Sequence, residues 1–345
     1  MRCINIASLK PGDVLGRTIY DHSGRALLVE KTVLTENFIN RLVGHGVVSV
    51  YIEDPKCPLG GEDIISQRTR QVAINTLREI ATSISQTSFT RKQDNGRRIS
   101  QLVEDIIEEL LNRKDSLINV IDLKDYDNYT YAHSVNVAVL SLVTGISLGL
   151  EYSQLKSLGM GALLHDLGKI FVPLEVLNKS GKLTDTEFAQ IKKHPEQGFA
   201  KAKEDDILDA PARAVILQHH EKLDGSGYPG NRRGKDIHNL AKIVAVADVY
   251  DALTSDRPYR ARWAPAQGLE YIYTIAGSHL EVGIVAKFVR NIAPFPLGSL
   301  VKCSNGMTGY VVENEINPHR PVLQVDDIKI DLNTELNITI TNIVT

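Results

Sequence analysis

The spacing of hydrophobic positions changes along the chain, and each change predicts a different kind of structure. From residue 1 to about residue 60, short apolar runs alternate with turn residues, a pattern typical of a small α/β unit. We predict strands at residues 14–20, 26–29 and 47–51, and a helix at residues 36–43 capped by Thr35. The proline- and glycine-rich segment at residues 55–61 then ends this unit.

Residues 62–123 are predicted to form a helical linker. Apolar residues recur at intervals of three and four, most clearly from Ile99 to Leu111, which is the pattern of one face of an amphipathic helix. A break is expected at residues 92–96. We expect the apolar face at residues 97–113 to pack on the next domain or against a second copy of the chain. In the second case this helix would mediate a homodimer.

The second half of the chain predicts a helical domain followed by strands. Residues 124–294 contain long stretches of helical periodicity and no alternating strand pattern. Pro294 and Pro296 end the helices, and residues 295–345 contain β-branched runs separated by turns. The expected fold is mainly α: an all-helical domain with a small α/β region at residues 1–60 before it and a β-rich extension after it.

Composition narrows the class of protein. The chain has 345 residues, with 39 Lys and Arg against 42 Asp and Glu, a balance that argues against coating a nucleic acid polymer or an anionic membrane. We find no apolar run long enough to span a bilayer and no signal-peptide pattern at the start, so we expect a cytoplasmic protein. Cys3, Cys57 and Cys303 are too far apart to suggest a disulfide framework or a zinc site.

Histidines are unevenly distributed, and five of the ten fall between residues 133 and 220. His165 and Asp166 interrupt an apolar stretch, where charged groups need a counter-ion, a metal or each other. Lys169 follows within one helical turn and shares their face. A single His-Asp pair is usually a solvated helix surface. Because the neighbours of His165 and Asp166 are apolar, a solvated surface is a poorer interpretation for this pair.

Five further positions carry similar groups. His219 and His220 precede a glycine-rich loop, and Asp248 lies inside a nearly continuous apolar run. His133 lies in an apolar helical stretch, where a lone histidine is more often a core residue, and His194 indicates little by itself.

Together the positions supply five imidazoles and two carboxylates without a thiolate, a set that suits iron, manganese, nickel or zinc. Seven ligands suit two ions that share one carboxylate, at a separation of roughly 3.5–4 Å, for attack of a hydroxide on phosphorus.

A basic segment follows Asp248. Arg257, Arg260 and Arg262 carry guanidinium groups, which bind phosphate through paired hydrogen bonds. A solvated basic turn is the alternative interpretation, and it is strongest for Arg262.

The combined motifs resemble one known family. HDLGK at residues 165–169, HHEKLDGSGYP at 219–229 and ADVYDALTSDRPYR at 247–260 resemble the HD-GYP subgroup of the HD-domain metal-dependent phosphohydrolases. The resemblance covers about residues 125–290. It implies an all-helical domain with two or three metal ions, usually iron or manganese, that hydrolyses the bacterial second messenger cyclic di-GMP.

The resemblance also implies roles for individual residues. One metal ion would be held by His133, His165, Asp166 and Asp248. The other would be held by Asp166 as a bridge, with His194, His219 and His220. Asp166 and Lys169 would be catalytic, with Lys169 on the scissile phosphate, and Arg257 and Arg260 would hold phosphate. The loop at Gly227, Tyr228 and Pro229 would lie beside the substrate and could engage a diguanylate cyclase.

Two positions depart from the family pattern. Three-metal members carry a glutamate where this chain has Tyr129, and a phenol with a reference pKa of about 10 is a poor replacement. We therefore expect two metal ions, and linear pGpG as the main product rather than complete conversion to GMP. Residues 278–282 also differ, which we expect to change only packing.

Three functions are compatible with this sequence. The first is hydrolysis of cyclic di-GMP by a metal-bridging hydroxide. The second is a non-catalytic, metal-bound receptor for a cyclic dinucleotide. The third is a hydrolase of cyclic GMP-AMP or another nucleotide.

Overall fold

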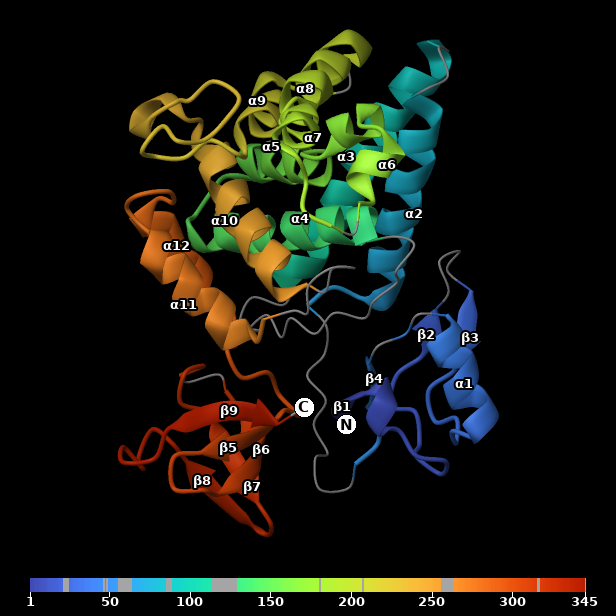
Figure 1. Ribbon diagram of the computed structural model, residues 1–345, viewed down its shortest axis with the longest axis vertical. Helices are drawn as coiled ribbons and strands as arrows, with labels where there is room; N and C mark the ends of the chain where they lie inside the picture. Colours follow the sequence, from blue (N-terminus) through green and yellow to red (C-terminus); the bar gives the residue numbers. More distant parts are fainter. Residues whose placement is uncertain are drawn as a thin grey trace.

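The computed structural model describes residues 1–20, 25–45, 47, 49–54, 64–84, 89–112, 129–179, 181–206, 208–255, 263–314 and 317–344. A small α/β unit comes first, a large helical assembly follows, and a β-sheet ends the chain (Figure 1). The mainly helical fold with two small flanking parts, expected from the sequence, is confirmed.

The N-terminal unit contains two short antiparallel strand pairs and one helix. β1 (Arg2–Asn5) pairs with β4 (Ser49–Ile52), and β2 (Ile19–Tyr20) pairs with β3 (Ala26–Leu28). Helix α1 (Glu36–Gly44) begins where Thr35 accepts a hydrogen bond from the backbone N–H of Phe38, as predicted. The strand at the start of the chain was not predicted, and the run at residues 14–20 forms a strand only at its end.

Helices α2 (Gln67–Ile84) and α3 (Phe89–Asn112) occupy the predicted linker. The predicted break at residues 92–96 is wrong, because α3 continues through them. Asn95 is buried there and donates a hydrogen bond to the Ser83 hydroxyl at 2.9 Å, which ties this turn of α3 to α2. The segment predicted as a break is therefore a helical turn that contacts α2 through a buried asparagine.

The buried face of α3 packs on α5 (Tyr152–Leu163), as expected for a helix that packs on the next domain. Gly159 of α5 permits this approach, because an added Cβ would lie 2.7 Å from a methyl carbon of Val103. Buried residues of α2 and α3 belong to the same hydrophobic cluster as those of the helices that follow. The domain boundaries themselves remain a prediction.

The remaining helices fill the central part of the chain. They are α4 (Tyr129–Ser147), α5, η3 (Leu167–Phe171), α6 (Leu174–Leu177), α7 (Asp185–Ile191), α8 (His194–Asp205), α9 (Ala210–Gln218), η4 (Gly234–Asp236), α10 (Asn239–Thr254), α11 (Pro265–Ile275) and α12 (Val282–Arg290). Within the described residues of this span, no strand is formed. Helix α10 is apolar on nearly every side and packs against α4, α9, α11 and α12, which places it at the centre.

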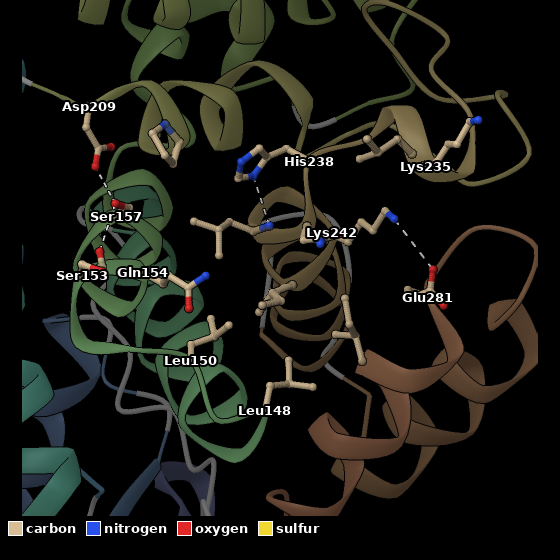
Figure 2. Close-up of a pocket in the computed structure, with 16 residues that line it drawn as sticks. Leu148, Leu150, Ser153, Gln154, Ser157, Asp209, Lys235, His238, Lys242 and Glu281 are labelled. Carbon is tan, nitrogen blue, oxygen red and sulfur yellow. Dashed lines mark hydrogen bonds and ion pairs between the residues drawn. The ribbon is translucent and has the colours of Figure 1, made fainter.

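Helices α5, α9 and α10 begin at the same end of the helical assembly. Their N-terminal ends line a groove of about 900 Å³, where Ser157 donates a hydrogen bond to Asp209 (Figure 2). The chain reaches His165 just after the end of α5 and His219 just after the end of α9. Helix C-termini carry partial negative charge, so this end of the assembly favours cations.

The C-terminal extension is rich in β-strands, as predicted, and these form a five-stranded antiparallel sheet. Its strands are β5 (Leu300–Cys303), β6 (Thr308–Glu313), β7 (Val322–Val325), β8 (Ile328–Asp331) and β9 (Ile340–Val344), in the order β8-β7-β6-β5-β9. Val301, Val311 and Leu323 form a small core of their own. Among the described helices, none is long and apolar enough to cross a membrane.

If α3 stabilises the same core as the later helices, Ile106→Ala will destabilise the whole helical assembly. Ile106 is fully buried, so we expect a loss of about 2–5 kcal/mol in the free energy of unfolding. Denaturant unfolding followed by circular dichroism measures this, with the exposed Glu108→Ala as the control. An unchanged main transition would contradict a shared core.

Candidate metal centre

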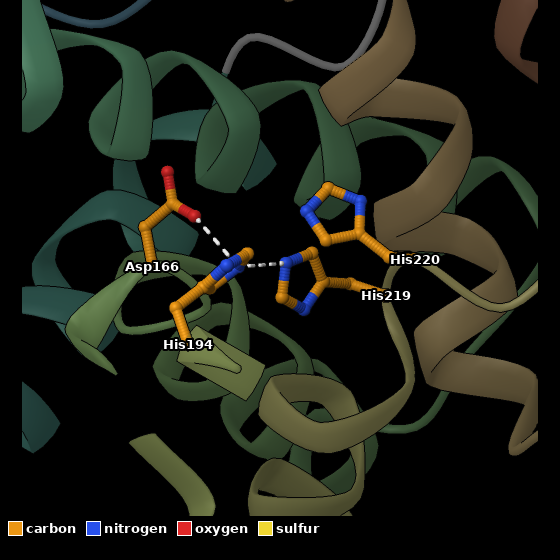
Figure 3. A group of neighbouring side chains, drawn as sticks. All are labelled: Asp166, His194, His219 and His220. Carbon is orange, nitrogen blue, oxygen red and sulfur yellow. Dashed lines mark hydrogen bonds and ion pairs between the residues drawn. The ribbon is translucent and has the colours of Figure 1, made fainter. Parts of the chain in front are cut away.

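The structure brings the five predicted histidines and two predicted aspartates to one buried place. They come from α4, α8, α10 and the turns that follow α5 and α9. Their ligand atoms fall into two groups, each with all atoms within 4.8 Å of one another. One group is Asp166, His194, His219 and His220 (Figure 3), and the other is His133, His165 and Asp248.

Asp166 stands between the two groups. Its Oδ1 lies 3.3 Å from Nε2 of His194, while its Oδ2 lies 3.4 Å from Nε2 of His165. Each carboxylate oxygen therefore faces a different group. This is the geometry that a carboxylate needs in order to bridge two cations.

Three of the histidines are oriented by the backbone. In each, Nδ1–H donates to the carbonyl three residues earlier, so in the neutral imidazole Nε2 is the atom with a lone pair for a cation. Nε2 of His194 and Nε2 of His219 lie 3.3 Å apart (Figure 3). The histidine and carbonyl pairs are His165 with Ala162 at 2.7 Å, His194 with Ile191 at 2.7 Å, and His219 with Ile216 at 2.9 Å. Because each of these histidines comes at or just beyond a helical turn, the local backbone sets its tautomer.

His133 is oriented by a side chain that sequence analysis missed. Its Nδ1–H donates to Oδ2 of Asp251 at 2.6 Å, and its Nε2 lies 3.1 Å from Oδ1 of Asp248. Asp251 is completely buried. The signal was present in the sequence, because Asp251 follows Asp248 by three residues in the same apolar helix and so shares its face.

The pKa values show how strongly this cluster favours positive charge near its carboxylates. Burial works to lower the pKa of His133, but hydrogen bonds with Asp248 and Asp251 outweigh it and raise the pKa to about 10. Burial likewise works to raise the pKa of Asp166, yet the charges of His165 and Lys169 hold it well below its usual value. Burial works to raise the pKa of Asp248 as well, but the hydrogen bond from His133 holds it well below its usual value. Asp166 and Asp248 are therefore both ionised at neutral pH.

The pKa values of His219 and His220 are lowered rather than raised. Burial lowers the pKa of His220 to about 3, and burial together with the neighbouring His220 lowers the pKa of His219 well below its usual value. Both imidazoles are neutral at neutral pH, which is the form that binds a metal ion.

Two buried atoms in the cluster give a direct test of whether a metal fits. Within the described part of the chain, Nε2 of His165 and Oδ1 of Asp166 make no hydrogen bond. Leaving such atoms unsatisfied costs about 1–3 kcal/mol each. Imidazole nitrogen and carboxylate oxygen are atom types that bind metal ions, and both atoms belong to the cluster, so the residues present fit divalent cations.

Lys169 lies at the edge of this cluster. Its ammonium group donates to Oδ2 of Asp166 at 2.6 Å, and its side chain is about a quarter exposed, at 26%. Asp166 and Lys169 also line a pocket of about 630 Å³ that opens beside the cluster. A ligand in that pocket would therefore meet both residues.

The loop after the histidine pair is fixed to the centre by Glu221. This buried carboxylate accepts hydrogen bonds from the backbone N–H groups of Gly230 at 2.7 Å and Arg232 at 2.9 Å. The Tyr228 ring lies 4.7 Å from the His220 ring, centroid to centroid. Gly227 has no room for a side chain, because an added Cβ would lie 2.5 Å from the His220 carbonyl oxygen.

The role of Glu221 was not predicted, although its position directly after the histidine pair was a signal. Residues 278–282, expected only to change packing, contact the same loop. Backbone carbonyls of Ser278 and His279 accept hydrogen bonds from Asp224 and Leu223.

Some predicted positions lie outside the described residues. These are Arg257, Arg260 and Arg262. Tyr129 begins α4, but its side chain is also outside the described part.

The fold and the cluster together define a helical domain built around a His/Asp centre for divalent cations. A family model described as HD domain matches residues 99–282, more than half of the chain. The chain therefore belongs to the HD-domain family of metal-dependent proteins. Its resemblance to the HD-GYP subgroup is confirmed.

Two curated relatives and one solved structure illustrate this membership. The chain is 38% identical over 214 residues to the cyclic di-GMP phosphodiesterase PA4108 of Pseudomonas aeruginosa, a match that covers 62% of this chain and 51% of that protein. It is 36% identical over 190 residues to the 3'3'-cGAMP-specific phosphodiesterase 1 of Vibrio cholerae, covering 54% and 42%. The chain thus spans about half the length of these relatives.

The solved structure of Bd1817, described as an HDG"Y"P protein from Bdellovibrio bacteriovorus, has a similar fold. The TM-score is 0.52 at 18% identity, and the match covers 83% of this chain and 97% of that one.

If Asp251 orients His133 for metal binding, Asp251→Asn will weaken metal affinity by roughly 10–100-fold, as loss of such a hydrogen bond to a metal-bound histidine typically does. The amide can donate to Nδ1 and so favours the wrong tautomer. Elemental analysis after dialysis against a graded chelator measures the loss, with the exposed Asp236→Asn as the control. Equal metal retention in the two variants would rule out this role.

Proposed function

We propose that this protein hydrolyses cyclic di-GMP to linear pGpG at a binuclear metal centre. The observation that carries the proposal is the position of Asp166, whose two oxygens face two separate groups of ligand atoms. The similarity to a protein named as a cyclic di-GMP phosphodiesterase supports the choice of substrate.

The seven ligands divide between two divalent ions, for which we propose iron or manganese. Asp166 would be shared. His133, His165 and Asp248 would complete one site, and His194, His219 and His220 the other. When bound, the ions would supply a water nucleophile activated at neutral pH and would polarise the phosphoryl oxygens.

Lys169 would act on the substrate's phosphate. Its ammonium group lies at the boundary between the cluster and the open pocket, where a phosphodiester beside Asp166 would come within reach. There it would neutralise negative charge that develops on the phosphoryl oxygens in the transition state. Arg257 and Arg260 are proposed to hold the substrate's phosphates.

The loop at Gly227, Tyr228 and Pro229 is proposed as a contact for the substrate or for a diguanylate cyclase. Its attachment through Glu221 and the stacking of Tyr228 near His220 support a link between this surface and the centre. We expect the enzyme to act in the cytoplasm, and a homodimer through the helices before the domain remains part of the proposal.

A second candidate substrate is cyclic GMP-AMP. The similarity to a protein named as a 3'3'-cGAMP-specific phosphodiesterase favours it. A panel of the two cyclic dinucleotides, with products separated by chromatography, decides between the substrates. Tight binding without product from the metal-loaded protein would instead favour a receptor.

If Asp166 bridges the ions, Asp166→Ala will remove both bound metal and turnover. The protein is purified without air and reconstituted with iron or manganese, and metal content is measured beside conversion of cyclic di-GMP to pGpG. Asp236→Ala, which changes an exposed carboxylate, is the control and is expected to match the wild type. Full activity with wild-type metal content in Asp166→Ala would rule out the bridge.

If Lys169 stabilises charge in the transition state, Lys169→Ala will lower kcat by roughly 100–1000-fold, the usual effect of removing one such donor. Metal content is expected to stay near that of the wild type, and Lys169→Arg is expected to recover part of the rate because it keeps a positive charge. Steady-state kinetics with elemental analysis of each variant checks this. A change confined to KM would point to substrate binding alone.

A further inference from the structure

The pocket beside Asp166 and Lys169 has a wall that comes from outside the matched family region. Helix α2 contributes Leu77, Ile80, Ala81 and Thr82 to its lining, whereas the family model matches only residues 99–282. In the structure, α2 packs against α4 (Figure 1), and α6 contributes Leu174 and Leu177 to the lining of the same pocket. A helix from the predicted linker therefore helps to shape the space next to the candidate centre.

Helix α2 is held firmly in this position. Arg70 donates a hydrogen bond to Asn136 of α4, and Glu109 of α3 accepts one from the backbone N–H of Ser66 at 2.6 Å. Leu77 and Ile80 are buried in the shared hydrophobic core. The part of the pocket lining that α2 supplies is thus a packed part of the helical assembly.

Two further lining residues of this pocket are apolar and unusually exposed. Ile170 of η3 is 40% exposed and Leu174 of α6 is 70% exposed, although both are large aliphatic residues. Helix α4 contributes Thr130, Tyr131 and Ser134, which are one aromatic residue and two residues with aliphatic hydroxyl groups. Aliphatic side chains from α2, η3 and α6, together with the aromatic ring and hydroxyl groups from α4, suit a flat ring with apolar faces and a polar edge.

We propose that this pocket binds one purine base of the cyclic dinucleotide and that α2 forms one wall of the base site. This proposal rests on the function proposed above. A phosphodiester held at Asp166 and Lys169 would have its attached nucleoside directly beside the pocket. Ala81 is small and half-buried in the lining, so it leaves room for a ring between α2 and the wall of η3 and α6.

The test fills the pocket without touching the centre. Ala81→Phe places a large side chain in the lining, and Val72→Phe adds the same side chain on α2 at a position that is 49% exposed and does not line the pocket. For the metal-loaded full chain, we measure Kd and KM for cyclic di-GMP, metal content, and hydrolysis of methyl p-nitrophenyl phosphate, which carries no nucleobase.

We expect Ala81→Phe to raise KM and Kd for cyclic di-GMP by roughly 10-fold or more, the usual scale for loss of one base contact. Metal content and hydrolysis of the small diester should stay within about two-fold of wild type, and Val72→Phe should behave as wild type. Unchanged Kd and KM in Ala81→Phe would overturn the proposal.

If Ala81→Phe loses activity on both substrates, the smaller Ala81→Leu decides. A selective rise in KM for cyclic di-GMP supports the base site, and an equal loss on both substrates overturns it. If the wild-type protein binds cyclic di-GMP without hydrolysing it, the proposed hydrolysis is wrong. The Kd of Ala81→Phe compared with that of the wild type then still tests the base site. Wild-type protein that does not bind cyclic di-GMP at all would end both proposals.

Discussion

The rest of the structure depends on the burial of carboxylates and imidazoles at one end of an apolar helical core. Asp166 and Asp248 are both almost completely buried and both ionised, a state that is costly unless compensating positive charge lies close by. His133 and Lys169 supply part of that charge in the protein alone. The unsatisfied ligand atoms of Asp166 and His165 show that the compensation is incomplete, which is why divalent cations fit.

The helices around the cluster fix the orientation of its histidine side chains. A ligand atom must point to one place, and an isolated histidine can rotate and change its tautomer. Here the backbone carbonyls of Ala162, Ile191 and Ile216 hold three of the imidazoles, and Asp251 holds a fourth. The ends of α5 and α9 also direct their partial negative charge toward the cluster. The same turns thus position the ligands and favour cations.

Helix α2 and the start of α3 precede the region that the family model matches, yet they pack into the same helical assembly. Their buried residues join the central hydrophobic cluster, and Gly159 lets α3 approach α5 closely. Because α2 also lines the pocket beside Lys169, a change that shifts α2 would reach this pocket without passing through the His/Asp cluster. This gives the N-terminal part of the chain a direct physical route to the centre.

The sequence by itself determined most of the helices and strands and their order, since hydrophobic spacing and turn residues act locally, and it determined which polar residues interrupt apolar stretches. It missed β1, and it failed at residues 92–96, where α3 continues and Asn95 makes an interhelical hydrogen bond. Only the tertiary structure decided that Asp251 would hold His133, from 118 positions away, and which oxygen of Asp166 faces which histidines. Such contacts depend on how packed helices are placed in space, and no local spacing in the chain encodes that placement.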